Sequence, residues 1–272
     1  MGLLPTYYVG VLTLSGLNFN ISIYQMSYEI VTYANKSHGL FEELTNNEFN
    51  VPVKVLGWGT EWKGFSDKTK GVMDYLKTKN ATDIIMFLDG FDTKINKDPS
   101  NVVELFKQFN CKILLSSDPN ISGKFITSLI FGTCKGSGTA NAGMYMGYAK
   151  ELLEFLEAEA KTKCKDDQLN FNTLCRSRDD IKVDESNVIF ENFKPTQINN
   201  ESNAPFVSYP GSPGLSRYSR AITEYAQFVY IYILCLLIVS MAFLPQHKNL
   251  LVTTTIAATA FYALFADKSC TV

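Results

Sequence analysis

The sequence predicts an α/β domain followed by a membrane-spanning helical hairpin, and three observations support this fold class. Short apolar runs alternate with amphipathic segments of helical length from residue 8 to residue 190, as in a sheet with helices on both faces. Residues 84–88 form a continuous apolar run, which is typical of a strand buried on both faces. Residues 225–244 and 250–266 contain no charged side chain, which is typical of transmembrane helices.

The individual elements follow from local patterns. Runs rich in β-branched and aromatic residues predict strands, and apolar residues at helical spacing predict helices. Asp98 and Pro99 form a helix-start signal, with Asp98 as the expected N-cap. The glycine-rich segment 119–140 is expected to be an irregular active-site loop. Strands are expected at 8–14, 51–57, 84–88, 112–117, 141–148, 181–183 and 188–190, and helices at 23–34, 66–79, 98–109, 151–162 and 165–174.

Bulk composition excludes several classes of protein. The chain has 272 residues with a net charge of -2, so nothing suggests broad binding to the phosphate backbone of nucleic acid. The six cysteines show no C-x-x-C spacing, which argues against a zinc site, and they are too sparse for a dense disulfide framework. The chain is therefore expected to bind no nucleic acid.

The two uncharged runs define the expected domain organisation. Residues 1–215 form the soluble domain, 216–224 a juxtamembrane linker, 225–266 two transmembrane helices and 267–272 a tail. The alternative is a buried core helix pair. No secretory signal is visible at the N-terminus, and the Lys and Arg residues near the spans favour a cytosolic catalytic part. The sequons at Asn20, Asn35, Asn80, Asn120 and Asn200 matter only if the domain is lumenal.

Two carboxylates follow the apolar run 84–88 directly. Asp89 and Asp92 stand three residues apart, and Gly90 between them permits a sharp turn. Ligands of open α/β sheets bind outside the carboxyl ends of the strands. Two acidic groups there suit a hard divalent cation such as Mn²⁺ or Mg²⁺ that holds a phosphate. The alternative is a loop with two solvated carboxylates.

Two further segments carry candidate site residues. Residues 57–64 combine glycine with Trp58 and Trp62, which suits a loop that stacks a planar ring; the alternative is a loop pinned by two buried tryptophans. Asp166 and Asp167 stand at an expected helix start, where an acidic residue is often only a cap that interacts with the helix dipole. A catalytic function for this pair is the other possibility.

Four motifs, taken in order, resemble one family. They are VKVLGWGTEWKG at 53–64, IIMFLDGFD at 84–92, NAGMYMGY at 141–148 and DDQL at 166–169. Together they are similar to the glycosyltransferase domain of the procollagen lysyl hydroxylases and related stand-alone transferases, over residues 7 to about 214. The resemblance implies a GT-A fold, which is a Rossmann-like mixed sheet that binds a UDP-sugar through Mn²⁺.

The resemblance also implies roles for individual residues. Asp89 and Asp92 are expected to bind the metal, and Asp166 and Asp167 are expected to lie near the anomeric carbon or the acceptor hydroxyl as catalytic groups. The metal would offset the charge on the leaving diphosphate. The residues expected to contact the nucleotide or its sugar are Thr13, Trp62, Lys70, Phe91, Asn141, Gly143 and Gln168.

Two departures from the family pattern accompany the resemblance. The family supplies a histidine as third metal ligand in a late glycine-rich loop, and Ser208 or Tyr209 stands there in this sequence. The family's loop tryptophan has no clear match within residues 119–140. The leading hypothesis is a membrane-anchored glycosyltransferase that moves a sugar from UDP to a hydroxyl of a protein or glycan. The rivals are a GT-A module that binds without chemistry and a purely structural membrane protein.

Overall fold

The computed structural model describes residues 28–120, 123–164, 166–194, 201–210, 230 and 232–265. The expected first strand at 8–14, with Thr13 at its end, lies outside the described residues.

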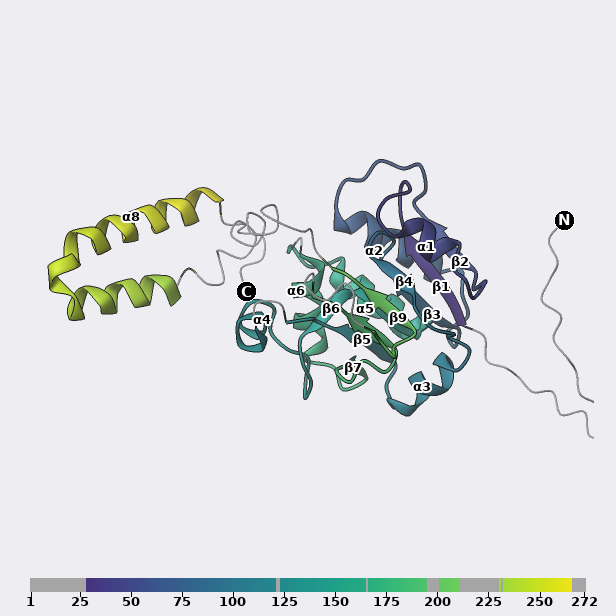
Figure 1. Ribbon diagram of the computed structural model, residues 1–272. Coiled ribbons are helices and arrows are strands. Elements are labelled where there is room, and N and C mark those ends of the chain that lie inside the picture. Colours follow the sequence, from purple (N-terminus) through teal and green to yellow (C-terminus); the bar gives the residue numbers. More distant parts are fainter. Residues whose placement is uncertain are drawn as a thin grey trace, which may run out of the picture.

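A six-stranded mixed sheet forms the centre of the domain (Figure 1), with the strand order β2-β1-β3-β6-β5-β7. The β6 strand runs antiparallel to both of its neighbours, and the other strand pairs are parallel. This arrangement confirms the expected α/β class with a mixed sheet. The strands are β1 (Tyr28–Tyr33), β2 (Val53–Leu56), β3 (Ile84–Leu88), β5 (Ile113–Ser117), β6 (Ala140–Tyr148) and β7 (Ile181–Asp184).

The apolar run of β3 is buried along its whole length, as expected. Because side chains alternate along a strand, Ile85 and Phe87 pack into one core, and Ile84, Met86 and Leu88 pack into the other. One face is covered by α2 (Phe65–Leu76), α5 (Ala149–Glu159) and α6 (Asp167–Cys175). The other face is covered by α1 (Phe41–Thr45), α3 (Val102–Gln108) and a small sheet of β4 (Thr93–Ile95), β9 (Phe206–Ser208) and β8 (Phe190–Asn192).

The expectation of a helix over 23–34 is wrong for the described part of that range. Residues Tyr28–Tyr33 form β1, which pairs with both β2 and β3. Its middle residues, Ile30, Val31 and Thr32, are all β-branched, and such side chains lose rotamer freedom in a helix but fit a pleated surface. Pairing with two strands outweighed the apparent helical spacing.

Three further local expectations are corrected. The helix expected from Asp98 begins at Val102 with Asn101 as N-cap, while Asp98 accepts the backbone N–H of Ser100 in a turn before it. The segment expected to be irregular contains α4 (Lys124–Phe131). The strand expected at 188–190 instead runs over Phe190–Asn192.

One disulfide lies in the core. Cys134 and Cys175 are 2% and 0% exposed and join the segment before β6 to the end of α6. It encloses a long loop, with the two cysteines 41 positions apart in sequence. The bond therefore ties the segment that leads into β6 to the C-terminal end of α6.

The C-terminal region contains two helical arms, residues 232–243 and 248–265, which lie side by side in Figure 1. Tyr230 stacks on Tyr262 with ring centroids 4.2 Å apart, and its hydroxyl lies 2.8 Å from that of Thr259. Among the described residues, no single helix is long and apolar enough to cross a membrane. Tyr232–Phe243 and Pro245–Ala260 pass that test only together, as a pair bent by 115°. The second arm includes α8 (Lys248–Phe265); the bent pair is one candidate span, so the expectation of two separate spans stays a prediction.

Candidate active site

Three strand ends meet at one edge of the sheet. Because β1 and β3 are parallel, their carboxyl ends lie side by side, which places Tyr33 and Ala34 next to Asp89 and Gly90. Because β6 is antiparallel to β3, its first residues reach the same edge, where the backbone N–H of Asp89 donates to the carbonyl of Gly143 over 2.8 Å. The reversed strand therefore adds its own side chains to an edge otherwise built from parallel strands.

Asp89 and Asp92 lie close enough at this edge to influence each other. Burial raises the pKa of Asp89. Burial, and then the charge of Asp89, raise the pKa of Asp92 to about 7. The Oδ1 of Asp89 accepts the backbone N–H of Phe91 at 3.4 Å. Two carboxylates that repel each other in a desolvated place attract a cation.

Ser208 lies against the second carboxylate. The β9 strand pairs with β4 so that Ser208 stands opposite Thr93, and its hydroxyl donates to Asp92 Oδ1 over 3.1 Å. Ser208 is 1% exposed. Of the two residues at which the family pattern has histidine, Ser208 is therefore the one whose side chain bonds to Asp92.

Lys68 supplies the positive charge at this edge, whereas the expected Lys70 is exposed. Lys68 is buried and forms an ion pair with Asp167 from the start of α6. Burial lowers the pKa of Lys68, but the charges of Asp167 and then Asp89 outweigh this effect, so its pKa is raised. The two lysines are two positions apart on α2, about 200° around the helix, so only one of them can face the sheet.

The two acidic residues at the start of α6 have different surroundings. Asp166 is the N-cap of α6, and its Oδ1 accepts the backbone N–H of Leu169 over 2.8 Å. Asp167 instead turns inward to Lys68. The capping interpretation therefore holds for Asp166, whereas a catalytic function of Asp167 stays a prediction.

A hydrogen-bonded network joins β6, α6 and the end of β5. Asn141 donates to Gln168 Oε1 over 3.2 Å and accepts the backbone N–H of Gly143 over 2.8 Å. Gln168 in turn donates to Asp118 Oδ2 over 2.7 Å. A Cβ on Gly143 would lie 2.9 Å from Asn141 Oδ1 and 3.8 Å from Asp89 Cβ. Asp118, which directly follows β5, was not among the expected site residues.

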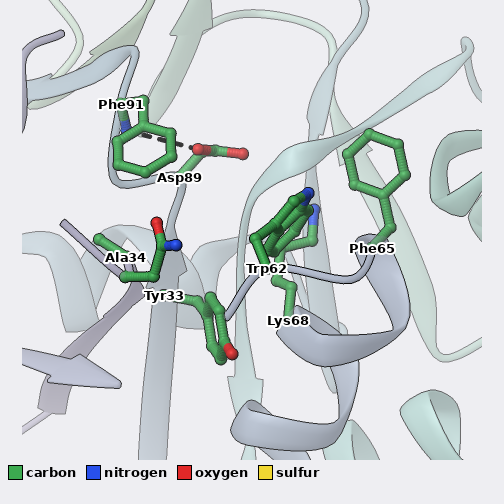
Figure 2. A pocket seen from close by; sticks show the side chains of 8 residues that line it. Tyr33, Ala34, Trp62, Phe65, Lys68, Asp89 and Phe91 are labelled. Atoms are coloured by element: carbon green, nitrogen blue, oxygen red, sulfur yellow. Dashed lines mark hydrogen bonds between the residues drawn. The ribbon is translucent and has the colours of Figure 1, made fainter. Parts of the chain in front are cut away.

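A pocket that is open to solvent lies beside Asp89. In Figure 2, Phe91 and Asp89 lie on one side of it, and Trp62, Lys68 and Phe65 on the other. The expected Trp62 and Phe91 are thus brought together, although Trp62 is 44% exposed and lies at the rim. The remaining lining residues are Tyr33, Ala34 and Asn35, from the end of β1 and just beyond it.

Thr32 stands one residue before the end of β1, beside Gly90. Thr32 is completely buried there, and its hydroxyl has no hydrogen-bond partner. A Cβ on Gly90 would lie 2.9 Å from that hydroxyl and 3.1 Å from the Cβ of Ala34. Gly90 is therefore needed for close approach to β1. The run of β-branched residues in β1 was the sequence signal that could have located this threonine.

The donor set fits a divalent cation that arrives with a phosphate. Within the described ranges, no three His, Cys, Asp or Glu side chains converge to hold a metal ion. Mg²⁺ is commonly bound by one or two carboxylates together with substrate phosphates and waters. Asp89 and Asp92, with the Ser208 hydroxyl beside them, match that partial set, whereas a closed protein cage would need more ligands.

The raised pKa of Asp92 predicts a pH dependence of the metal-free protein. Between the ordinary value of 3.8 and about 7, the folded chain holds a proton that the unfolded chain has released. Stability should therefore fall as pH rises through this interval. Asp92→Asn should flatten this dependence, as measured by urea unfolding in chelator at about pH 4 and about pH 8. Asp74→Asn, on the exposed face of α2, is the control, and an equal slope in all three proteins would contradict the assignment.

Comparison with known proteins agrees with this geometry. The family model described as "PLOD GT domain" matches residues 25–204. The Caenorhabditis elegans multifunctional procollagen lysine hydroxylase and glycosyltransferase is 26% identical over 167 residues, which is 53% of this chain and 22% of the relative. Procollagen-lysine,2-oxoglutarate 5-dioxygenase 2 of Mus musculus is 26% identical over 60% of this chain and 24% of its own length. Procollagen-lysine,2-oxoglutarate 5-dioxygenase 1 of Gallus gallus is 28% identical over 53% of this chain and 22% of its own length.

The chain thus spans about a quarter or less of these relatives, and the match falls on their glycosyltransferase region. The match to the family model begins at residue 25, just before β1, so the segment around Thr13 lies outside this match. The family model matches most of the described domain, and the mixed sheet carries acidic, basic and aromatic side chains at one edge. This chain therefore belongs to the PLOD glycosyltransferase domain family.

Proposed function

We propose that this protein is a metal-dependent glycosyltransferase that moves a sugar, such as a hexose, from a UDP-sugar to a hydroxyl group of a protein or glycan. The observation that carries the proposal is the convergence of Asp89, Asp92 and Lys68 beside an aromatic pocket at the carboxyl edge of the sheet. Membership of the family supplies the sugar-donor chemistry, and the choice of UDP and of the acceptor is part of the proposal.

The pocket suits a nucleoside diphosphate. Tyr33, Trp62 and Phe91 offer ring faces on which a uracil base can stack. Lys68 lies at the phosphate end beside Asp89, and Lys68 rather than Lys70 takes the role of the phosphate-binding lysine. A divalent cation held by Asp89 and Asp92 would offset the negative charge that develops on the leaving diphosphate.

Asp167 is the residue that we assign to the reacting centre. Without donor it pairs with Lys68; a bound diphosphate gives Lys68 a second anionic partner and loosens this pair. The carboxylate of Asp167 can then accept the proton of the acceptor hydroxyl or stabilise the positive charge on the departing sugar ring. Asp166 holds the N-terminus of α6 in place, while Asn141, Gly143 and Gln168 line the sugar subsite.

A donor screen on the full chain in detergent tests the proposal. A panel of UDP-sugars is incubated with Mn²⁺, with Mg²⁺ or with chelator, and UDP release is measured. At least one donor should be hydrolysed or transferred with a divalent cation and not in chelator. Metal-independent release, or release from no donor, would contradict the metal-dependent activity.

Lys68→Met should weaken donor turnover by about 10- to 100-fold, since a hydrogen bond to a charged group contributes about 1.5–3 kcal/mol. Lys70→Met is the matched control and should behave as the wild type, because this side chain is exposed on the same helix. The readout is kcat/KM for UDP release, with thermal unfolding measured in parallel to exclude misfolding. Equal losses in the two variants would argue against the assignment of Lys68.

Donor binding without turnover is the second candidate function. It is favoured by Ser208, which provides a neutral hydroxyl where the family pattern has a histidine. Calorimetry distinguishes the two candidates, because a binding module would retain UDP and metal binding in a protein that releases no UDP from any donor.

Membrane anchoring through the bent C-terminal pair is also part of the proposal. Its apolar side chains are largely exposed: Leu236 is 67%, Phe243 79% and Leu250 66% exposed. Such a surface needs a lipid or protein environment.

A further inference from the structure

The buried disulfide bears on the compartment in which the domain folds. Cys134 and Cys175 lie in the core and are bonded to each other. Persistent disulfides form in oxidising compartments and are rare in the cytosol, where thiols are kept reduced. This bond argues against the cytosolic placement expected from the charges near the C-terminal segments, and for a domain on the lumenal side of a membrane.

On that side, exposed Asn-x-Ser/Thr sequons are acceptors for N-linked glycosylation. Five sequons occur in the sequence, and the structure describes the asparagines of three: Asn35, Asn80 and Asn120. Asn20 and Asn200 lie outside the described residues. The surroundings of the three side chains decide which of them an oligosaccharide can reach.

Two of the three are held in the fold. Asn35 lines the pocket, and its Nδ2 donates to the carbonyl of Thr60 over 3.2 Å. Asn120 adopts a positive φ of 52°, donates its Nδ2 to the carbonyl of Asp118, and has a buried Oδ1 without a partner. Glycan attachment to either nitrogen would break these bonds and crowd the candidate site.

Asn80 is more exposed to solvent than Asn35 and Asn120. It lies with Ala81 and Thr82 in an exposed turn between α2 and β3, so the whole sequon faces solvent. Its Nδ2 contacts only the side chain of Asp83, at 3.2 and 3.4 Å. The turn precedes β3, whereas Asp89 follows it, so the five-residue strand separates sequon and site by about 16 Å or more.

We propose that Asn80 is an N-glycosylation site and that the catalytic domain is lumenal. In the modification, the Asn80 amide nitrogen attacks C1 of a lipid-diphosphate-linked oligosaccharide. The N–C1 bond forms as the bond between C1 and the diphosphate oxygen breaks, the lipid diphosphate leaves, and the amide nitrogen loses one proton. No electrons are transferred. The disulfide, in contrast, forms by exchange with an oxidised dithiol carrier, which takes up two electrons and two protons from Cys134 and Cys175.

The test expresses the full chain in eukaryotic cells with a glycosylating secretory pathway. Peptide N-glycosidase F should increase gel mobility, and mass spectrometry of the treated protein should find aspartate at position 80. Asn80→Gln and Thr82→Ala should each reduce the shift by one glycan, while Thr82→Ser and Asn35→Gln should leave the shift unchanged. Asn80→Gln should retain wild-type UDP release, because the turn is remote from the pocket.

Alkylation of the unreduced protein separates the two parts of the proposal. Cys134 and Cys175 should react with maleimide only after denaturation and reduction. A protected disulfide without glycan at Asn80 would overturn the modification site. Free thiols at both positions in the denatured, unreduced protein, together with no glycan, would overturn the lumenal placement as well. Neither result depends on whether UDP release is detected, so failure of this inference and failure of the proposed activity are distinguishable.

Discussion

Replacement of Asp92 by asparagine is expected to lower the rate of sugar transfer by about 10²–10³-fold, the loss that follows removal of one preorganised electrostatic group. The substitution keeps the size of the side chain and an oxygen that can still accept the Ser208 hydroxyl. What it removes is one of the two negative charges that would hold a divalent cation beside the leaving diphosphate. The loss should appear in kcat/KM for UDP release and be only partly recovered by raising the metal concentration.

The control for this experiment is Asp74→Asn, which removes an exposed carboxylate from α2. It should leave turnover unchanged. Binding of Mn²⁺ in the presence of UDP, followed by calorimetry, should weaken in Asp92→Asn and not in the control. Wild-type turnover by Asp92→Asn would refute the role of this residue and leave an α/β domain whose acid pair has no catalytic function.

Replacement of Cys134 and Cys175 by alanine is expected to lower the free energy of unfolding by about 4 kcal/mol. This value follows from the entropy of a loop closed across 41 positions. Because domains are stable by only about 5–15 kcal/mol, the loss removes a large part of the total. The end of α6 and the segment before β6 should then separate more readily, which also loosens Asn141 and Gln168 at the site.

Urea unfolding of the double variant and of the wild type, with and without reductant, measures the effect. Cys111→Ala is the matched control, because Cys111 is a free, partly buried cysteine whose removal opens no disulfide-closed loop. The reduced wild type should approach the double variant, while the control stays close to the oxidised wild type. Equal stability of all proteins under both conditions would show that the bond does not contribute to the fold.

Short patterns predicted the part of the site that lies on one strand. The continuous apolar run of β3 could be buried only between two layers, and the residues after it could lie only at the edge of the sheet. The neighbouring carboxylates Asp89 and Asp92 were therefore placed together by their spacing alone. The strand over 141–148 was also predicted from its strand-like run, and the structure buries it along most of its length.

The residues that come from other elements were predicted less well. Lys70 and Lys68 are both plausible on α2, and only the direction in which the helix packs decides which of them meets Asp89. Likewise, the apolar spacing in the sequence of β1 suggests a helix, and only the pairing with β2 and β3 shows that this segment is a strand. Asp118 joins the site through Gln168, which is 50 positions away, and no local pattern reports a contact over that distance.

By itself, the sequence determined the α/β class, the buried central strand and the two acidic residues at its end, because periodicity and burial act over a few neighbouring residues. Only the tertiary structure decided that Thr32 of β1 packs beside Gly90, that Lys68 faces the acid pair, and that Asp166 caps a helix while Asp167 turns inward. It also paired Cys134 with Cys175. These outcomes depend on how elements distant in sequence pack together, and packing is a property of the whole chain.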